Sequence, residues 1–170
     1  TVSAVRVEPK DIPLTFEYAA RAQGSKETEV RARVGGILLK RNYVEGSTVK
    51  EGDVLFEIDP EPFKVALEQA KASLAQNKAQ LKAAETQWAR ISKLFEQRVV
   101  SEKSRDDALA NLDSLRASTQ LAKAQVDKAQ LDLGYTTVKA PISGVTSMEA
   151  QSEGSLIATT DSSSLLTTIT

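Results

Sequence analysis

Apolar and small residues recur at alternating steps of four and three through the first half of the central region. The positions are Phe63, Leu67, Ala70, Leu74, Asn77, Leu81, Ala84, Trp88, Ile91 and Phe95. This spacing is that of the a and d positions of a coiled coil, and Asn77 is the only polar residue among them. Pro60 and Pro62 precede the series, where a first helical turn tolerates proline. The pattern predicts a long helix with one apolar stripe.

A second series has the same rhythm and ends just before Gly134, a residue that favours the end of a helix. Its positions are Ser101, Arg105, Ala108, Leu112, Leu115, Thr119, Ala122, Val126, Ala129 and Leu133. The phase of the repeat changes between the two series, at about residues 96–100. Two helices joined by a turn near Arg98 explain this change better than one straight helix.

The two series match as an antiparallel pair, in which the numbers of facing residues have a constant sum. Eight pairs, from 63 with 133 to 88 with 108, give the same sum of 196. Large residues then face small ones, as Trp88 faces Ala108 and Leu112 faces Ala84. Asn77 faces Thr119, and a buried polar pair of this kind can fix register at some cost in stability. We therefore predict a helical hairpin whose arms are about 50 Å long.

Two segments that flank the hairpin resemble each other at an offset of 108 residues. "VRARVGGILLKRNYVEGSTVKEGD" begins at Val30, and "VKAPISGVTSMEAQSEGSLIATTD" begins at Val138. Such a split repeat indicates one small β domain in two halves, with the hairpin inserted between them. The strands expected are 30–34, 37–44, 47–50 and 54–58, then 137–142, 145–150 and 155–159. We interpret Gly36, Gly46, Gly52, Gly144 and Gly154 as turn or close-approach positions.

The two ends also have the alternation of strands. Residues 1–27 carry apolar side chains at Val2, Ala4, Val5, Val7, Ile12, Leu14, Phe16 and Tyr18, and "SLLTTIT" occupies 164–170. The chain is thus expected to be an elongated, multidomain α+β protein. Its parts are outer strands at 1–27, a first half-motif at 28–60, the hairpin at 61–134 with its tip at 96–100, a second half-motif at 135–161, and at 162–170 the start of a strand of a further β domain.

Composition removes several classes of function. The chain has no histidine and no cysteine, and its net charge is −1. Thiol nucleophiles, Cys/His metal sites and histidine-based acid–base chemistry are therefore excluded, and no charge excess favours nucleic acid. Asp106 and Asp107 are adjacent on a helix and point apart. No apolar run is long enough to span a bilayer. We expect no enzyme, no metal and no cofactor.

The first half-motif resembles half of a lipoyl or biotinyl domain. The similarity lies in "VEGSTVKEGDVLFEID", from Val44 to Asp59, and in the preceding "VGGI". Carrier domains of that kind hold a modified lysine in a tight turn between their halves. Here "IDPEPF" and the hairpin replace the turn, and the nearby Lys64 is on the predicted helix. The resemblance therefore implies the fold of the carrier and argues against its lipoate or biotin.

A lipoyl half, a long helical hairpin and a second half opening with "APISG" resemble the periplasmic adaptors, or membrane fusion proteins, of tripartite efflux pumps. "VGGILLKRNYVEGSTVKEGDVLFEIDPEPF" and "LDLGYTTVKAPISGVTSMEAQSEG" are most similar to adaptors of RND-type multidrug transporters. The resemblance implies a periplasmic, inner-membrane-associated protein that links an RND transporter to a TolC-type outer-membrane channel and associates with itself into a ring. It also implies that the terminal strands belong to a β-barrel and a membrane-proximal domain.

Hairpin tips of that family carry arginine, leucine and serine at a spacing that Arg90, Leu94 and Ser101 reproduce. By resemblance these three residues would dock the outer-membrane channel. Each also has a simpler interpretation: Arg90 as solvated charge, Leu94 as an extension of the hairpin core, and Ser101 as the N-cap of the second helix. Val99 and Val100 at the apex would be costly if exposed in an isolated chain and useful at an interface.

Two other functions fit parts of the sequence. An adaptor of an ABC-type secretion or macrolide pump would share the architecture, and the transporter that binds it would distinguish the two. A carrier subunit with biotin or lipoate is disfavoured by the missing lysine turn, and the intact mass of the protein would test it.

Overall fold

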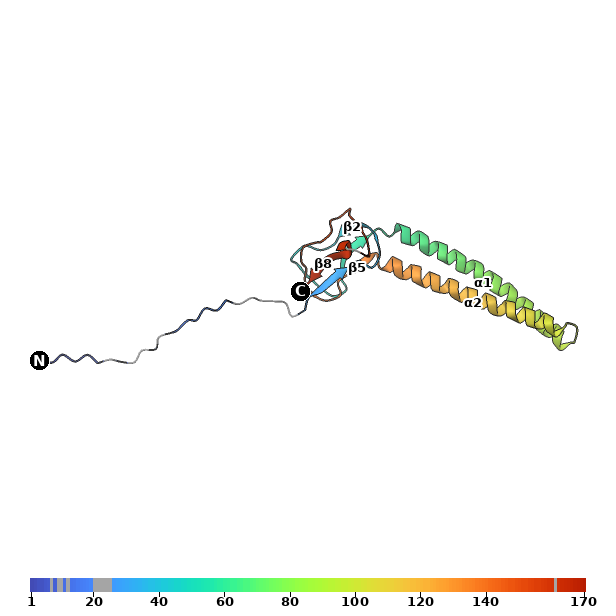
Figure 1. Ribbon diagram of the computed structural model, residues 1–170, viewed down its shortest axis with the longest axis horizontal. Helices are drawn as coiled ribbons and strands as arrows, with labels where there is room; N and C mark the ends of the chain where they lie inside the picture. Colours follow the sequence, from blue (N-terminus) through green and yellow to red (C-terminus); the bar gives the residue numbers. More distant parts are fainter. Residues whose placement is uncertain (7, 9–10, 12, 20–25, 161) are drawn as a thin grey trace.

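The computed structural model describes residues 1–6, 8, 11, 13–19, 26–160 and 162–170. A long pair of antiparallel helices projects from one side of a small β unit (Figure 1). Neither helix in this described part of the chain is long and apolar enough to cross a membrane.

The hairpin consists of α1 (Glu61–Glu96) and α2 (Glu102–Gly134). All predicted stripe positions are buried or half-buried except Ser101, and the most buried are Leu67, Ala84, Leu112 and Ala122. The predicted pairing is confirmed at its polar layer, where the Thr119 hydroxyl lies 3.4 Å from the carbonyl oxygen of Asn77. The two side chains do not bond each other directly, because each also hydrogen-bonds a carbonyl of its own helix.

The β unit is made of short antiparallel strands. They are β1 (Thr28–Arg31), β2 (Gly36–Arg41), β3 (Thr48–Val49), β4 (Val54–Ile58), β5 (Thr137–Lys139), β6 (Gly144–Val145), β7 (Leu156–Ile157) and β8 (Leu165–Ile169). One sheet has the order β5-β4-β2-β7, and two smaller sheets pair β1 with β8 and β3 with β6. The two helices of the hairpin are connected to adjacent strands of one sheet. β4 leads into α1 and α2 leads into β5, and these two strands pair with each other, with Glu57 opposite Thr137.

The internal repeat is visible in the strand pairing. Gly36 pairs with Ile157 and Ile37 with Leu156 in the β2–β7 ladder. Adding or subtracting the offset of 108 converts these pairs into those of the β3–β6 ladder, Gly144 with Val49 and Val145 with Thr48. Each half thus gives a strand to the other, and neither half completes its sheets alone.

One hydrophobic core joins the two halves. Leu38, Leu55 and Phe56 from the first half and Ile157 from the second are at most 1% exposed. The glycines have the two roles expected of them: Gly46, Gly52 and Gly154 have positive φ angles, whereas Gly36 and Gly144 lie where a side chain would collide with neighbouring atoms.

The expectation for the C-terminal strand requires correction. The strand expected at 164–170 forms as β8, but it pairs with β1, and its Leu166 and Ile169 lie in the core of the β unit. It belongs to this unit because its apolar face is buried there, rather than in a further domain. The described residues of 1–27 are assigned to no strand, and Val7 and Ile12 lie outside the described residues. The outer strands expected there stay a prediction.

Candidate functional site at the tip of the hairpin

The end of α1 is closed by a left-handed turn at Arg98, whose φ is 59°. The Val99 N–H donates to the Leu94 carbonyl and the Arg98 N–H to the Phe95 carbonyl, both at 2.9 Å. These two bonds define a Schellman motif, in which glycine is the usual left-handed residue. Arginine at this position was not signalled by the sequence, and it directs the chain sharply from α1 toward α2.

Ser101 begins α2 as its N-cap. Its backbone is extended, with φ −74° and ψ 157°, and its hydroxyl accepts a hydrogen bond from the Ser104 N–H at 3.2 Å. The capping interpretation of Ser101 is therefore confirmed. Glu102 in the first turn of α2 is also favourable there, because a carboxylate complements the positive end of the helix dipole.

A stacked pair holds the two helices together below the turn. The guanidinium carbon of Arg105 lies 4.6 Å from the centre of the Phe95 ring. Arg105 also pairs with Asp106 at 2.8 Å and with Glu102 at 3.4 Å, and the hydrogen bond to Asp106 raises the pKa of Arg105. Sequence reasoning placed both residues on the stripe but missed this contact, since simple pairing set Phe95 opposite Ser101. Arg105, the one charged residue of the second stripe, was the available signal.

Arg90 and Leu94 lie one turn apart on α1, and Ser101 lies across the turn at the start of α2. Arg90 is exposed, whereas Leu94 is half-buried beside the helix interface. At the apex, Val99 is 67% exposed and Val100 is half-buried. The tip therefore presents an exposed apolar side chain among exposed charges of both signs, the cations Arg90, Lys93 and Arg98 and the anions Glu96 and Glu102. Such a surface is suited to contact rather than to catalysis.

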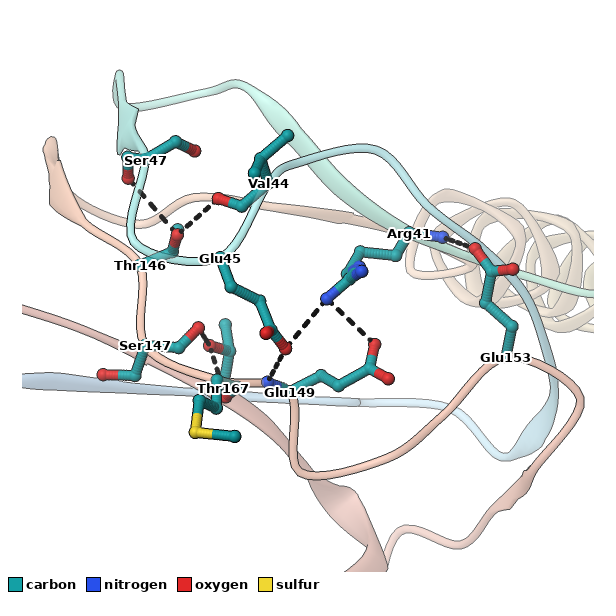
Figure 2. Close-up of polar contacts among 10 residues, drawn as sticks. Arg41, Val44, Glu45, Ser47, Thr146, Ser147, Glu149, Glu153 and Thr167 are labelled. Atoms are coloured by element: carbon teal, nitrogen blue, oxygen red, sulfur yellow. Dashed lines mark hydrogen bonds and ion pairs between the residues drawn. The ribbon is translucent and has the colours of Figure 1, made fainter.

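The base that carries the hairpin is tied together by an ionic cluster between the two halves of the β unit (Figure 2). The Arg41 guanidinium lies 2.9 Å from the Glu45 carboxylate and 3.3 Å from that of Glu149, and the backbone N–H of Arg41 donates to the Glu153 carboxylate. The Thr146 hydroxyl lies 3.2 Å from the carbonyl oxygens of Val44 and Ser47. Sequence reasoning did not identify this cluster, because its contacts between the two halves join residues 104 to 112 positions apart in the chain.

Tyr43 lies against this cluster, since the Arg41 guanidinium carbon is 5.5 Å from the centre of its ring, and the ring forms a T-shaped pair with Phe56. Its hydroxyl is buried and lacks a hydrogen-bond partner within the described residues. Burial raises the pKa of Tyr43; the nearby Thr167 lowers it, but the Thr167 hydroxyl is turned toward the carbonyls of Ser147 and Met148.

Lys64, the lysine nearest to the position of a carrier lysine, is in the first turns of α1 and pairs with Glu61 at 2.7 Å. It is on a regular helix, not in a tight turn. The described residues contain no group of three or more histidine, cysteine or carboxylate side chains placed to hold a metal ion.

A split β unit that carries a long helical hairpin is the architecture of an adaptor-type scaffold. The sequence profile of the family described as "RND MFP, barrel-sandwich hybrid domain" matches residues 26–169. The chain belongs to this family, the RND-type membrane fusion proteins, whose members are adaptors and not enzymes.

Curated relatives align with nearly the whole chain. The efflux pump periplasmic linker BepD of Brucella suis is 52% identical over 169 residues, which is 99% of this chain and 43% of that protein. The multidrug resistance protein MdtE of Escherichia coli K12 is 34% identical, over 98% of this chain and 43% of that protein. The chain thus spans less than half the length of these relatives.

A solved structure supports the same arrangement of the hairpin and the β unit. The MacA–MexA chimeric protein, which contains the α-hairpin domain of Pseudomonas aeruginosa MexA, aligns with a TM-score of 0.56 and 27% identity. The alignment covers 85% of this chain and 48% of the chimera.

Proposed function

We propose that this chain is the hairpin-bearing part of a periplasmic adaptor that links an inner-membrane RND efflux transporter to a TolC-type outer-membrane channel. The adaptor acts by docking and by forming a conduit with other copies of itself, and it serves the export of drugs and other xenobiotics without catalysing a reaction. Its place is the periplasm, in association with the inner membrane.

The tip carries this proposal. Val99 is exposed at the apex, and Arg90 and Leu94 precede it on the last turns of α1. An exposed apolar residue on a charged helix tip favours a protein partner that supplies an apolar groove with polar groups around it. The relatives named efflux pump linker and multidrug resistance protein support a channel as that partner.

The RND type of transporter is favoured over an ABC-type partner by the family assignment, which covers both halves of the β unit. A lipoate or biotin carrier is disfavoured by the helical position of Lys64 and its ion pair with Glu61.

Site-directed photocrosslinking in cells that express the full-length protein tests the docking role. A photoreactive residue at Leu94 should crosslink to the outer-membrane channel, and the same residue at exposed Lys82 should not. Both positions are on α1, so the comparison separates the tip from the shaft. A folded, expressed protein that gives no channel crosslink from Leu94 would leave Arg90, Leu94 and Ser101 with structural roles only.

A further inference from the structure

A cleft with three cations in its lining lies between β1 and β5, beside the end of α2. It has two adjoining parts of about 390 and 360 Å³, which share Arg31, Arg33, Lys139 and Pro141. We call it the basic cleft. Glu29, the one carboxylate in its lining among the described residues, is paired with Arg31 at 2.8 Å. Arg33 and Lys139 form no ion pair within the described part of the chain, so the cleft has an excess of positive charge.

Equivalent parts of the two halves form the basic cleft. The offset of 108 converts Arg31 into Lys139, so the internal repeat places a cation at the same position of both halves. It also superimposes β1 on β5. Each of these strands is at the edge of its sheet, because β5 is the terminal strand of the four-stranded sheet and β1 pairs only with β8 among the described strands. Two sheet edges therefore border one positively charged cleft.

The backbone of β5 is available for hydrogen bonding on the side away from β4. The Thr136 carbonyl and the Ala140 N–H bond to β4 and the residue before it, at 2.8 and 2.9 Å. Alternate residues of an antiparallel strand bond to opposite sides, so the N–H and C=O groups of Thr137 and Lys139 are directed away from β4. No described strand pairs with β5 on that side. An edge of this kind can receive an extended segment as an additional strand.

Two of the three cations are held in place by their neighbours. The guanidinium carbon of Arg33 lies 5.1 Å from the centre of the Tyr135 ring, and the Arg31 guanidinium donates to the Ser164 hydroxyl at 3.0 Å. A guanidinium that stacks on a ring can still donate from its edge to a carboxylate. Because a cleft concentrates the field of its charges, these cations attract an anion more strongly than they would on a flat surface.

We propose that the basic cleft binds an extended acidic segment of a partner protein. The segment adds to the free edge of β5 as a strand, and its carboxylates pair with Arg31, Arg33 and Lys139. The backbone hydrogen bonds supply affinity for an extended chain, and the cations select a chain that carries carboxylates. This site is at the base of the hairpin, at the opposite end from the tip, and it does not depend on docking of the tip to a channel.

Calorimetric titration of the full-length protein with synthetic peptides tests the proposal. The probe is a short peptide of alternating threonine and glutamate, with both ends blocked. One control peptide has glutamine in place of glutamate, and the other keeps the glutamates but is methylated at every backbone nitrogen. Both controls should bind at least about tenfold more weakly, because the first loses its charge-assisted hydrogen bonds and the second its N–H donors. Absence of binding by the acidic peptide, or equal binding by either control, overturns the proposal.

A charge reversal then locates the bound peptide. Lys139→Glu changes a cation of the basic cleft, and Lys40→Glu is the matched control, because it is also an exposed lysine on a strand of the β unit but lies outside the cleft. Lys139→Glu should weaken binding of the acidic peptide by about tenfold or more, and Lys40→Glu should leave it unchanged. Circular dichroism verifies that both variants are folded. Equal effects of the two variants would mean that the peptide responds only to net charge, and the cleft assignment would be wrong.

Discussion

Single residues in the β unit are constrained by how closely the two halves approach each other. A Cβ atom at Gly144 would lie 2.5 Å from the Thr170 carbonyl oxygen and 2.7 Å from a methyl carbon of Ile169. The equivalent glycine of the first half, Gly36, would meet Ile58 at 2.8 Å. The requirement for glycine at both positions follows from packing, since neither has a positive φ angle.

Gly144→Ala should therefore destabilise the protein by about 1–3 kcal/mol, because backbone atoms must move to admit the methyl group. Gly134→Ala is the matched control. Gly134 ends α2 with no atom within 4 Å of the added carbon, so alanine there should be neutral or stabilising. Urea unfolding followed by circular dichroism would measure both, and equal stabilities would contradict the close-approach argument.

Tyr43→Phe should leave the protein equally stable or up to about 1 kcal/mol more stable at pH 7, because it removes a buried hydroxyl with no partner among the described residues. The raised pKa of Tyr43 also gives a pH dependence. The unfolded chain loses its phenol proton first, near the ordinary value of about 10, so stability from this group is complete below that pH and falls above it.

The measurement for Tyr43 is urea unfolding at neutral pH and above pH 10. The wild-type protein should lose more stability over this interval than the phenylalanine variant, which has no phenol at this position. Parallel losses in the two proteins would show that Tyr43 does not contribute to the alkaline decrease.

At the scale of elements, the hairpin is the part that sequence reasoning described best. A strict four-three repeat gives each helix one apolar face that must be buried. The constant sum of the residue numbers of facing residues then predicts the register of the antiparallel pair. The turn was less predictable, because arginine in a left-handed conformation has no local signature. The Arg105–Phe95 stack was missed for a related reason: pairing arithmetic places Cα atoms, whereas a long arginine side chain reaches along the helix.

Arg98→Gly should stabilise the hairpin by up to about 1 kcal/mol, because glycine adopts the left-handed conformation without the steric cost of a Cβ atom. Gln97→Gly is the control, since Gln97 has φ −80° and gains nothing from glycine. Thermal unfolding monitored by the helical circular dichroism signal would compare them. A higher midpoint for Gln97→Gly than for Arg98→Gly would be inconsistent with strain at the turn.

At the scale of the whole molecule, the split repeat was readable because the two halves kept their glycines and apolar positions at a constant offset. The exchange of strands between halves gives that offset a structural meaning, since each short ladder has a counterpart in the other half. The position of β8 was not readable. An isolated strand pattern does not say which sheet it joins, and only the burial of Leu166 and Ile169 decides it.

Both helices of the hairpin are joined directly to adjacent strands, so a small movement between these strands is amplified at the tip. The legs leave from β4 and β5, which are hydrogen-bonded neighbours, and two packed helices are separated by about 10 Å. The tip is about 50 Å away. If β5 slides along β4 by about 1 Å, the hairpin tilts by about 6° and its tip moves by about 5 Å. A displacement at the base smaller than a hydrogen bond is therefore magnified about fivefold at the tip.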